Sequence, residues 1–304
     1  MAAMKILNFG SLNLDYVYRV AHSVQPGETI ASSGMETFCG GKGLNQSVAL
    51  ARAGAEVYHA GRVGEDGQLL IETCWQSGVH TELILQTNGK SGHTIIQVDD
   101  NGQNSILLAG GANRRITEQD VETALRAFGA GDLLLLQNEI SCLPVLIERA
   151  YEKGMRVVLN PSPCDETIAA CDLKKVSMLL LNEIEAAQIT GETEQAQIEA
   201  AFARRYPQTQ ILLTLGGSGS RYLYGEERYA QGVFDVTPVD TTAAGDTYTG
   251  YFLAALAEGQ PVPACMKLAA KASAIAVTRP GASSSIPWRE EVERAQLQEL
   301  PAKV

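Results

Sequence analysis

One carboxylate, Asp246, directly follows Gly245 at the point where polar residues give way to a helical apolar run. The stretch reads DTTAAGDTYTG over 240–250 and continues as YFLAALAEG. Aspartate is a favoured helix N-cap, so a structural interpretation explains this residue about as well as a functional one. In the functional interpretation, Asp246 takes a proton from an attacking hydroxyl group beside an anion held at the helix N-terminus.

The residues just before Asp246 have the properties of an anion pocket. Backbone N–H groups at a helix N-terminus bind phosphate, and small side chains let a phosphoryl group approach them. Ala243, Ala244 and Gly245 are all small. If this helix end faces a cleft, the amides of 243–246 stabilise the transferring phosphoryl group while Asp246 acts as the base.

Three further segments carry polar or glycine-rich patterns that suit nucleotides or sugars. CGGKGLNQS over 39–47 places Lys42 among backbone amides, although a flexible turn explains the glycines equally well. LGGSGS over 215–220 offers free amides for phosphate. NEIE over 182–185 places Glu185 one helical turn from an amide, where its carboxylate could hold Mg²⁺ through water. Neither a Walker A spacing nor a GxGxxG loop after a strand is present.

The bulk composition is that of an acidic globular chain. Its 304 residues include 24 Lys and Arg against 35 Asp and Glu, a formal net charge of −11. This charge argues against nucleic acid as a partner. The six cysteines form no CxxC pair and no metal-ligand spacing with the four histidines, which favours free thiols. Because no apolar stretch reaches membrane-spanning length and no signal peptide is visible, we expect a cytoplasmic protein without membrane contact.

Strand-like and helical segments alternate along most of the chain. Continuous apolar runs such as LLLLQ, RVVLN, SMLLLN and ILLTLG indicate strands buried on both faces, as in a parallel sheet between layers of helices. Helical spacing is found over 43–54, 67–78, 143–154, 245–258 and 261–277, and the tail after 280 reads as a loop. The sequence therefore predicts one α/β domain over 1–304 with a doubly wound, mostly parallel sheet.

Two stretches interrupt this alternation. Residues 13–40 and about 91–110 alternate apolar and polar residues, which indicates strands with one exposed face. HTIIQVDDNGQNSILL is a good hairpin with Asn101-Gly102 at its turn. We expect these strands to form a small antiparallel sheet that stands off the main domain as a lid or a dimer surface.

Nearly every apolar run ends in a polar or glycine cluster. Ligands of open α/β sheets bind beyond the carboxyl ends of the strands, where these clusters should lie. A turn explains any single cluster, but together they indicate a long polar cleft. The clusters are 10–13, 137–139, 160–161, 182–183 and 214–217.

Two longer motifs connect these features to a known family. GGKGLNQSVALARAGAEVYHAGRVGEDG near the N-terminus and VDTTAAGDTYTGYFLAAL near the C-terminus resemble the signatures of the ribokinase-like (PfkB) sugar kinases. The resemblance runs nearly end to end. It implies ATP-dependent phosphorylation of a sugar's primary hydroxyl group, with D-ribose as the leading acceptor, on a doubly wound domain whose β lid pairs two chains into a homodimer.

The resemblance also implies roles for individual residues. Sugar contacts would come from Asn13, Asp15, Gly41, Lys42, Gly43, Asn45 and Glu139, with Asp246 as the base beside Ala243, Ala244 and Gly245. Nucleotide contacts would come from Asn182, Thr214, Leu215, Gly216, Gly217, Ser218, Gly219 and Gly245. Glu185 would position Mg²⁺ through water, and K⁺ would bind at Asp240, Thr242, Ala276, Arg279, Gly281 and Ser285.

Two positions depart from the family pattern. Ala243 replaces the first glycine of GAGD, which is harmless provided that the backbone there does not need a positive φ. Ala270 stands where relatives often place His or Asn near the adenine, so the basis of adenine selectivity is weakened.

Several other functions stay open on the sequence alone. Kinases of 2-deoxyribose, fructose or pseudouridine share these motifs, and a nucleoside kinase would place aromatic residues in the lid, where Tyr16 and Phe38 are the candidates. A non-catalytic sugar- or nucleotide-binding regulator on the same fold is disfavoured by the presence of Asp246. An NAD-dependent dehydrogenase is disfavoured because its phosphate fingerprint is missing.

Overall fold

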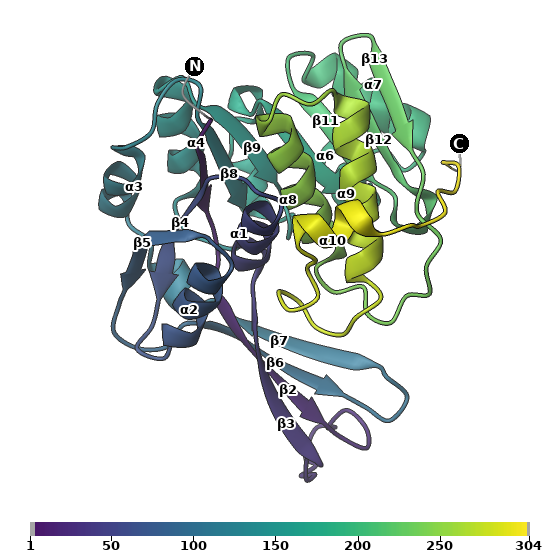
Figure 1. Ribbon diagram of the computed structural model, residues 1–304. Coiled ribbons are helices and arrows are strands. Elements are labelled where there is room, and N and C mark those ends of the chain that lie inside the picture. Colours follow the sequence, from purple (N-terminus) through teal and green to yellow (C-terminus); the bar gives the residue numbers. More distant parts are fainter. Residues whose placement is uncertain (1–3, 303–304) are drawn as a thin grey trace.

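A nine-stranded sheet forms the centre of the molecule (Figure 1). The computed structural model describes residues 4–302. The strand order is β13 (Glu227–Gln231), β12 (Ser220–Tyr224), β11 (Gln210–Thr214), β10 (Met178–Asn182), β9 (Arg156–Asn160), β8 (Leu133–Gln137), β1 (Ile6–Phe9), β4 (Val57–Val63) and β5 (His80–Gln86). From β11 to β5 the neighbours pair in parallel, whereas β12 and β13 add antiparallel pairs at one edge. The predicted mostly parallel sheet is confirmed.

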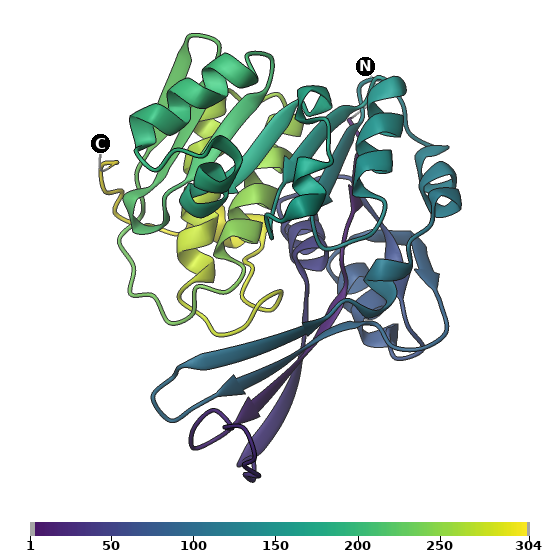
Figure 2. The same ribbon diagram turned by 180° about the vertical axis from the view of Figure 1, so that it is seen from behind.

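Helices cover both faces of this sheet, as the view from behind shows (Figure 2). One face carries α1 (Lys42–Arg52), α2 (Gln68–Gln76), α8 (Ala244–Ala257), α9 (Val262–Ala276) and α10 (Arg289–Arg294), and the other carries α3 (Glu118–Leu125), α4 (Leu143–Glu152), α5 (Glu166–Ala169), α6 (Glu183–Thr190) and α7 (Gln195–Arg205). Within β8, Leu133 and Leu135 pack into the first core, whereas Leu134 and Leu136 pack into the second. The continuous apolar runs follow from this double burial.

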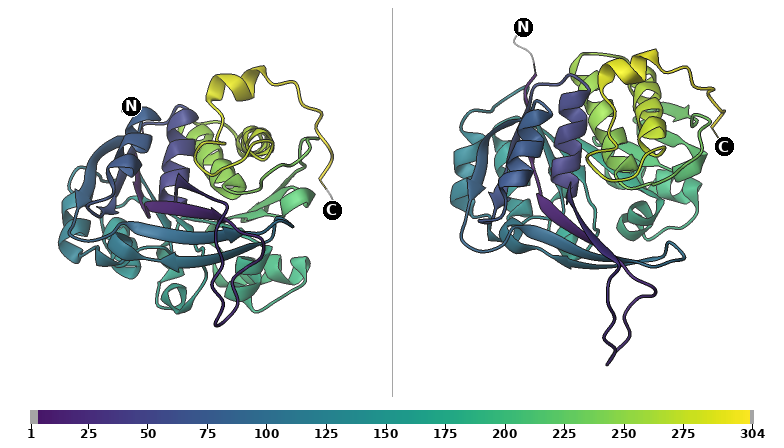
Figure 3. Two further views of the ribbon diagram at one scale, coloured as in Figure 1. Left: turned by 90° about the horizontal axis from the view of Figure 1, so that it is seen from below. Right: turned by 60° about the horizontal axis from the view of Figure 1, so that its bottom comes forward.

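A second sheet of four strands forms the lid, in the order β3 (Gly34–Gly40), β2 (Asn13–Arg19), β6 (Gly92–Val98) and β7 (Asn104–Ala109). The β6–β7 hairpin turns at Gly102, whose φ is 76°. The expected small antiparallel sheet is present with one difference, because the central β2–β6 pair is parallel. Both strands leave the main body in the same direction from separate insertions, so they run side by side away from it (Figure 3).

The tail after 280 contains an element that the sequence reading missed. α10 forms over Arg289–Arg294, although we expected only a loop there. Ion pairs of Arg289 with Glu293 and of Glu290 with Arg294 lie one helical turn apart, and Val292 is buried against the first core. One apolar contact and two exposed pairs suffice for a single turn and a half, but they leave only a short pattern in the sequence.

The lid leaves the main sheet at the carboxyl end of β1, so it stands on the side where the parallel strands end (Figure 1). Ligands of doubly wound sheets bind on this side. Within residues 4–302, no helix is both long and apolar enough to cross a bilayer.

Candidate active site

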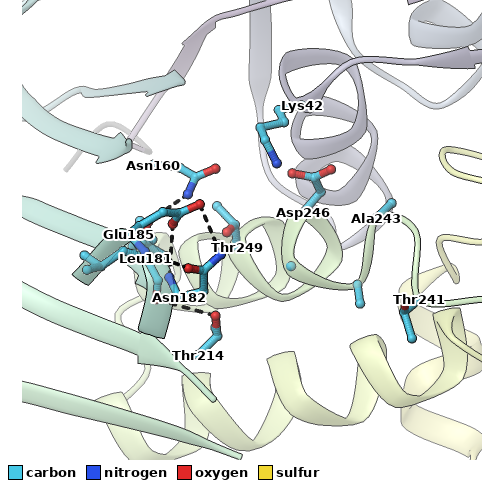
Figure 4. A pocket seen from close by; sticks show the side chains of 13 residues that line it. Lys42, Asn160, Leu181, Asn182, Glu185, Thr214, Thr241, Ala243, Asp246 and Thr249 are labelled. Carbon is cyan, nitrogen blue, oxygen red and sulfur yellow. Dashed lines mark hydrogen bonds between the residues drawn. The ribbon is translucent and has the colours of Figure 1, made fainter. Parts of the chain in front are cut away.

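A cavity of about 250 Å³ lies at the carboxyl ends of β9, β10 and β11, beside the N-termini of α6 and α8 (Figure 4). It is lined by Lys42, Asn160, Leu180, Leu181, Asn182, Glu185, Thr214, Thr241, Ala243, Ala244, Gly245, Asp246 and Thr249. The structure thus brings the proposed base and its helix end together with the candidate cation and the NEIE carboxylate.

Asp246 lies in the first turn of α8 and does not cap it. The residue at the N-cap position is Ala243, and no side chain caps this helix. Instead, Asn45 Nδ2 donates to Asp246 Oδ2 at 3.0 Å and Gln46 Nε2 donates to Oδ1 at 2.8 Å. The capping interpretation is therefore wrong, and two amides from α1 hold a buried carboxylate at the cavity wall.

The backbone at Ala243 has a positive φ, so the replacement of glycine by alanine at this position is not harmless. Its φ of 58° and ψ of 12° place it in the left-handed region, where a residue with a Cβ costs about 1–2 kcal/mol. This turn directs the start of α8 towards the cavity. The Ala244 amide donates to the Thr241 carbonyl at 3.2 Å, a long bond that would compete with a bound anion.

Lys42 is the cation of the site, and three carboxylates surround it. Burial by itself would lower the pKa of Lys42, because it disfavours the charged form. The negative charges of Asp246, Glu139 and Glu185 outweigh this and raise the pKa above its ordinary value. The ammonium group therefore stays charged between Asp246 and the two other acids.

Glu139, just after β8, joins Lys42 to Ser11, which lies between β1 and β2. Its Oε2 accepts from the Lys42 backbone amide at 3.0 Å and from the Ser11 hydroxyl group. Gly41 precedes α1 with a φ of 89°, and a Cβ there would lie 3.1 Å from the backbone nitrogen of Asn13. A glycine is required at this turn, because it lets the lid strand and α1 approach each other.

On the lid side of the cleft, the Asp15 carboxyl group has a strongly raised pKa. Burial raises the pKa of Asp15 to about 6; a hydrogen bond from Thr94 lowers it less, and the nearby charge of Glu139 adds to the rise. Asn13 is held from the other side, because Asn113 Nδ2 donates to Asn13 Oδ1 at 2.7 Å. This bond leaves the amide hydrogens of Asn13 available as donors.

Four residues of this region were missed by sequence reasoning, namely Gln46, Thr94, Asn113 and, as a partner of Glu139, Ser11. Ser11 stood in a strand-end cluster and Gln46 in the GGKGLNQ motif, so a signal existed for both. Thr94 and Asn113 carried none, since each is an ordinary polar residue, the first in β6 and the second in a short 3-10 helix over Gly111–Arg115.

A second cavity of about 580 Å³ continues from the first along α8 and α9. Asn182, Thr214, Thr241, Ala244 and Gly245 line both cavities. Gly216, Gly217 and Gly219 line the second cavity together with the apolar Phe234, Val277 and Ala270, whereas Leu215 and Ser218 do not line it. This shape suits a nucleotide whose phosphates lie at the shared wall and whose base lies between apolar side chains.

Glu185 has a structural role as well as a place in the cavity wall. Its Oε2 accepts from the Asn182 amide at 3.0 Å, and the Asn182 side chain accepts from the Glu185 amide at 2.9 Å, which makes a capping box at the start of α6. The carboxylate is buried and fixed in direction (Figure 4). A fixed carboxylate at the wall of an anion pocket suits outer-shell contact with Mg²⁺.

None of the residues implied for K⁺ lines either cavity, and a hydrogen-bonded pair among them, Asp240 and Gly281, joins the segment before α8 to the segment after α9. Asp240 Oδ2 accepts from the Gly281 amide at 2.9 Å and Oδ1 accepts from the Thr242 amide at 2.8 Å. Burial works against the charge, but these donors lower the pKa of Asp240, so it stays ionised. A carboxylate oxygen is a ligand type that fits a hard cation. Within residues 4–302, no three His, Cys, Asp or Glu side chains group as metal ligands.

Fold and site together have the features of a small-molecule kinase: a lid, a polar acceptor side, a nucleotide groove and a carboxylate between them. The model of the pfkB family carbohydrate kinases matches residues 3–289. The chain belongs to this family of carbohydrate kinases and transfers phosphate to a hydroxyl acceptor.

Several ribokinases are similar to this chain. A ribokinase of Haemophilus influenzae is 37% identical over 93% of this chain and 95% of its own length. The structure of an Arabidopsis thaliana ribokinase complexed with ribose and ATP is 32% identical, has a TM-score of 0.85, and the match covers 97% of this chain and 98% of that one. A deoxyribokinase of Salmonella typhi is 30% identical over 95% of this chain and 97% of its own length.

Proposed function

We propose that the protein transfers the γ-phosphoryl group of ATP to the primary hydroxyl group of D-ribose and releases ribose 5-phosphate and ADP. The observation that carries the proposal is the position of Asp246, at the start of α8 between the acceptor side and the nucleotide groove. The similarity to ribokinases, one of them solved with ribose and ATP, supports the choice of substrates.

Each part of the site has a role in this reaction. ATP supplies the phosphoryl group, with its phosphates at the wall shared by the two cavities. Asp246 accepts the proton of the attacking hydroxyl group, and the start of α8 together with Lys42 stabilises the charge on the transferring group. Glu185 orients Mg²⁺ through water.

The acceptor is held by side chains of the lid and of the first helix. Asp15 and Glu139 accept hydrogen bonds from sugar hydroxyl groups, while Asn13 and Lys42 donate them. Within residues 4–302, Glu139 Oε1 has no hydrogen-bond partner, so it is available to a hydroxyl group. Paired donors and acceptors of this kind suit the adjacent hydroxyl groups of a polyol.

The test of the substrate is a panel of acceptors. ATP consumption is measured with ribose, 2-deoxyribose, fructose, adenosine and pseudouridine, and the product is identified by phosphorus NMR. We expect the highest kcat/KM with ribose and a phosphate on its primary hydroxyl group. A higher value for 2-deoxyribose would instead favour the activity of the Salmonella relative, and binding without turnover of any sugar would favour the regulator.

The K⁺ site is the second part of the proposal. Bound K⁺ would contact the loops of Asp240 and Gly281 rather than ATP, and it would order the turn at Ala243 through the adjoining chain. We expect K⁺ to raise kcat or lower the KM of ATP relative to Na⁺ and Li⁺ at equal ionic strength. Equal rates in the three salts would remove the cation site.

The lid carries the surface for a second copy of the chain. On β7, the side chains of Ile106, Leu107 and Leu108 are 59%, 65% and 50% exposed, an unusual run of large apolar residues. We propose that two lids pair through this strand to form a homodimer. Light scattering should give twice the monomer mass for the native chain and the monomer mass for Leu107→Glu.

A further inference from the structure

A chain of buried amide side chains runs beneath the candidate active site and ends at Asp246. Asn8 on β1, Gln137 on β8 and Gln46 on α1 are each 0% exposed. Gln137 Nε2 donates to Asn8 Oδ1 at 3.0 Å and to Gln46 Oε1 at 2.6 Å. Gln46 Nε2 then donates to Asp246 Oδ1 at 2.8 Å. Of these four hydrogen-bonded residues, Asp246 alone lines the cavity.

A main-chain carbonyl group sets the direction of every hydrogen bond in this network of amide side chains. Asn8 Nδ2 donates to the Gly43 carbonyl at 2.7 Å, and a carbonyl oxygen can only accept. Asn8 must therefore present its oxygen to Gln137, which must present its NH₂ group to Gln46. The oxygen of Gln46 is thereby occupied, so its NH₂ group faces Asp246.

A second anchor on the other side of Gln46 requires the same orientation. Asn160 Nδ2 donates to the Leu180 carbonyl at 2.8 Å, which turns Asn160 Oδ1 towards Gln46. Gln46 Nε2 donates to this oxygen at 3.2 Å in addition to Asp246. Two main-chain carbonyls, Gly43 in α1 and Leu180 in β10, thus prevent Gln46 from flipping, and a flip would place its oxygen against a carboxylate.

We propose that Gln46 is a positioning residue of the phosphoryl transfer, which fixes the Asp246 carboxylate in the direction of the acceptor hydroxyl group. Asn45 donates to the second carboxylate oxygen but is itself an expected sugar contact. Gln46 is fully buried and lines neither cavity, so it acts on the reaction through Asp246, with which it makes a shorter hydrogen bond (2.8 Å) than with Asn160 (3.2 Å). This inference rests on the proposed function, because it requires Asp246 to be the base.

The test compares Gln46→Met in two backgrounds, with ribose and ATP as substrates. Methionine keeps the length of the side chain and removes both donors. A hydrogen bond to a charged group is lost, so we expect kcat to fall about 10- to 100-fold, while both KM values stay within about threefold. In the Asp246→Asn background, the same substitution should change the residual kcat by less than about threefold, because the carboxylate that Gln46 positions is gone.

A kcat within about threefold of the native value, or a fall of equal size in both backgrounds, would overturn the proposal. Gln46→Asn, which keeps the amide but withdraws it, has the same expected result and replaces Gln46→Met if circular dichroism shows that the latter does not fold. The exposed Gln76→Met on α2 serves as the control and should leave kcat unchanged. Failure of Asp246→Asn to reduce turnover would contradict the proposed function itself, whereas an inert Gln46→Met beside an inactive Asp246→Asn contradicts only this inference.

Discussion

The two sides of the cleft are built differently. On the acceptor side, Asn13, Asp15, Glu139 and Asp246 are each directed by a hydrogen bond from another side chain. On the nucleotide side, the groove is lined largely by glycine backbone and small apolar groups, with Ala270 among them. Directed side chains discriminate between hydroxyl patterns, whereas backbone and apolar walls recognise phosphate and shape. Selectivity should therefore be stricter for the sugar than for the base.

The largest effect is expected from Asp246→Asn. Asparagine fills the same space but cannot accept the proton, and a general base contributes about 10²–10⁴-fold to turnover. We expect kcat to fall by that factor while ribose and ATP bind almost as before. Steady-state kinetics and calorimetric titration of each substrate separate the two quantities. Unchanged kcat would remove Asp246 from the chemistry.

Asp15→Asn should weaken the binding of ribose and raise the free energy of unfolding. Loss of a charged acceptor should raise the KM of ribose about 10- to 100-fold with little change in the KM of ATP. The pKa of Asp15 is about 6 in the folded protein, against 3.8 in the unfolded chain. The stability that this group contributes is therefore fully present below pH 3.8 and is lost as pH rises through 6. Removing the charge should therefore stabilise the protein by on the order of 1–2 kcal/mol at pH 8 and by little at pH 4. Urea unfolding at both pH values checks this, and a variant that is less stable at pH 8 would contradict it.

The raised pKa of Asp15 also predicts how ribose binding depends on pH. In the proposed complex, ribose hydroxyl groups donate to ionised Asp15, and protonation below about pH 6 removes this hydrogen-bond acceptor. The KM of ribose should rise about tenfold between pH 7 and pH 5, while the KM of ATP changes much less. In Asp15→Asn this rise should disappear. A rise of the same size in the variant would assign the pH dependence to another group.

The smallest effect is expected at Ala243. Glycine adopts a φ of 58° without a Cβ clash, so Ala243→Gly should relieve strain, partly offset by the greater freedom of glycine in the unfolded chain. The net gain in unfolding free energy should be about 0.5–1 kcal/mol, with kcat changed less than threefold. Ala244→Gly, at a helical position, is the control and should lower stability. A loss of stability in Ala243→Gly would show that the turn is not strained.

The sequence was sufficient for the fold and for the position of Asp246 at the start of a helix. Runs such as LLLLQ and RVVLN predicted doubly buried parallel strands, and the GD step before an apolar helix predicted the helix end at the cleft. α10 was not visible, because six residues with one buried side chain give no usable periodicity.

The partners of the site residues could not be predicted in this way. Gln46 and Asp246 lie 200 positions apart, and Asn113 lies 100 positions from Asn13. Such pairs depend on the packing of α1 against α8 and of the 3-10 helix Gly111–Arg115 against the lid, which local patterns do not describe. The strain at Ala243 likewise depends on how the preceding loop is attached, so the substitution in the GAGD motif was visible but its cost was not.

The most direct test of the whole account is a crystal structure of Asp246→Asn with ribose and ATP bound. We predict that the primary hydroxyl group of ribose lies within hydrogen-bond distance of residue 246, while the γ-phosphate faces the start of α8. A sugar bound with this hydroxyl group directed away from residue 246, or a nucleotide outside the groove between β11 and α9, would contradict the account.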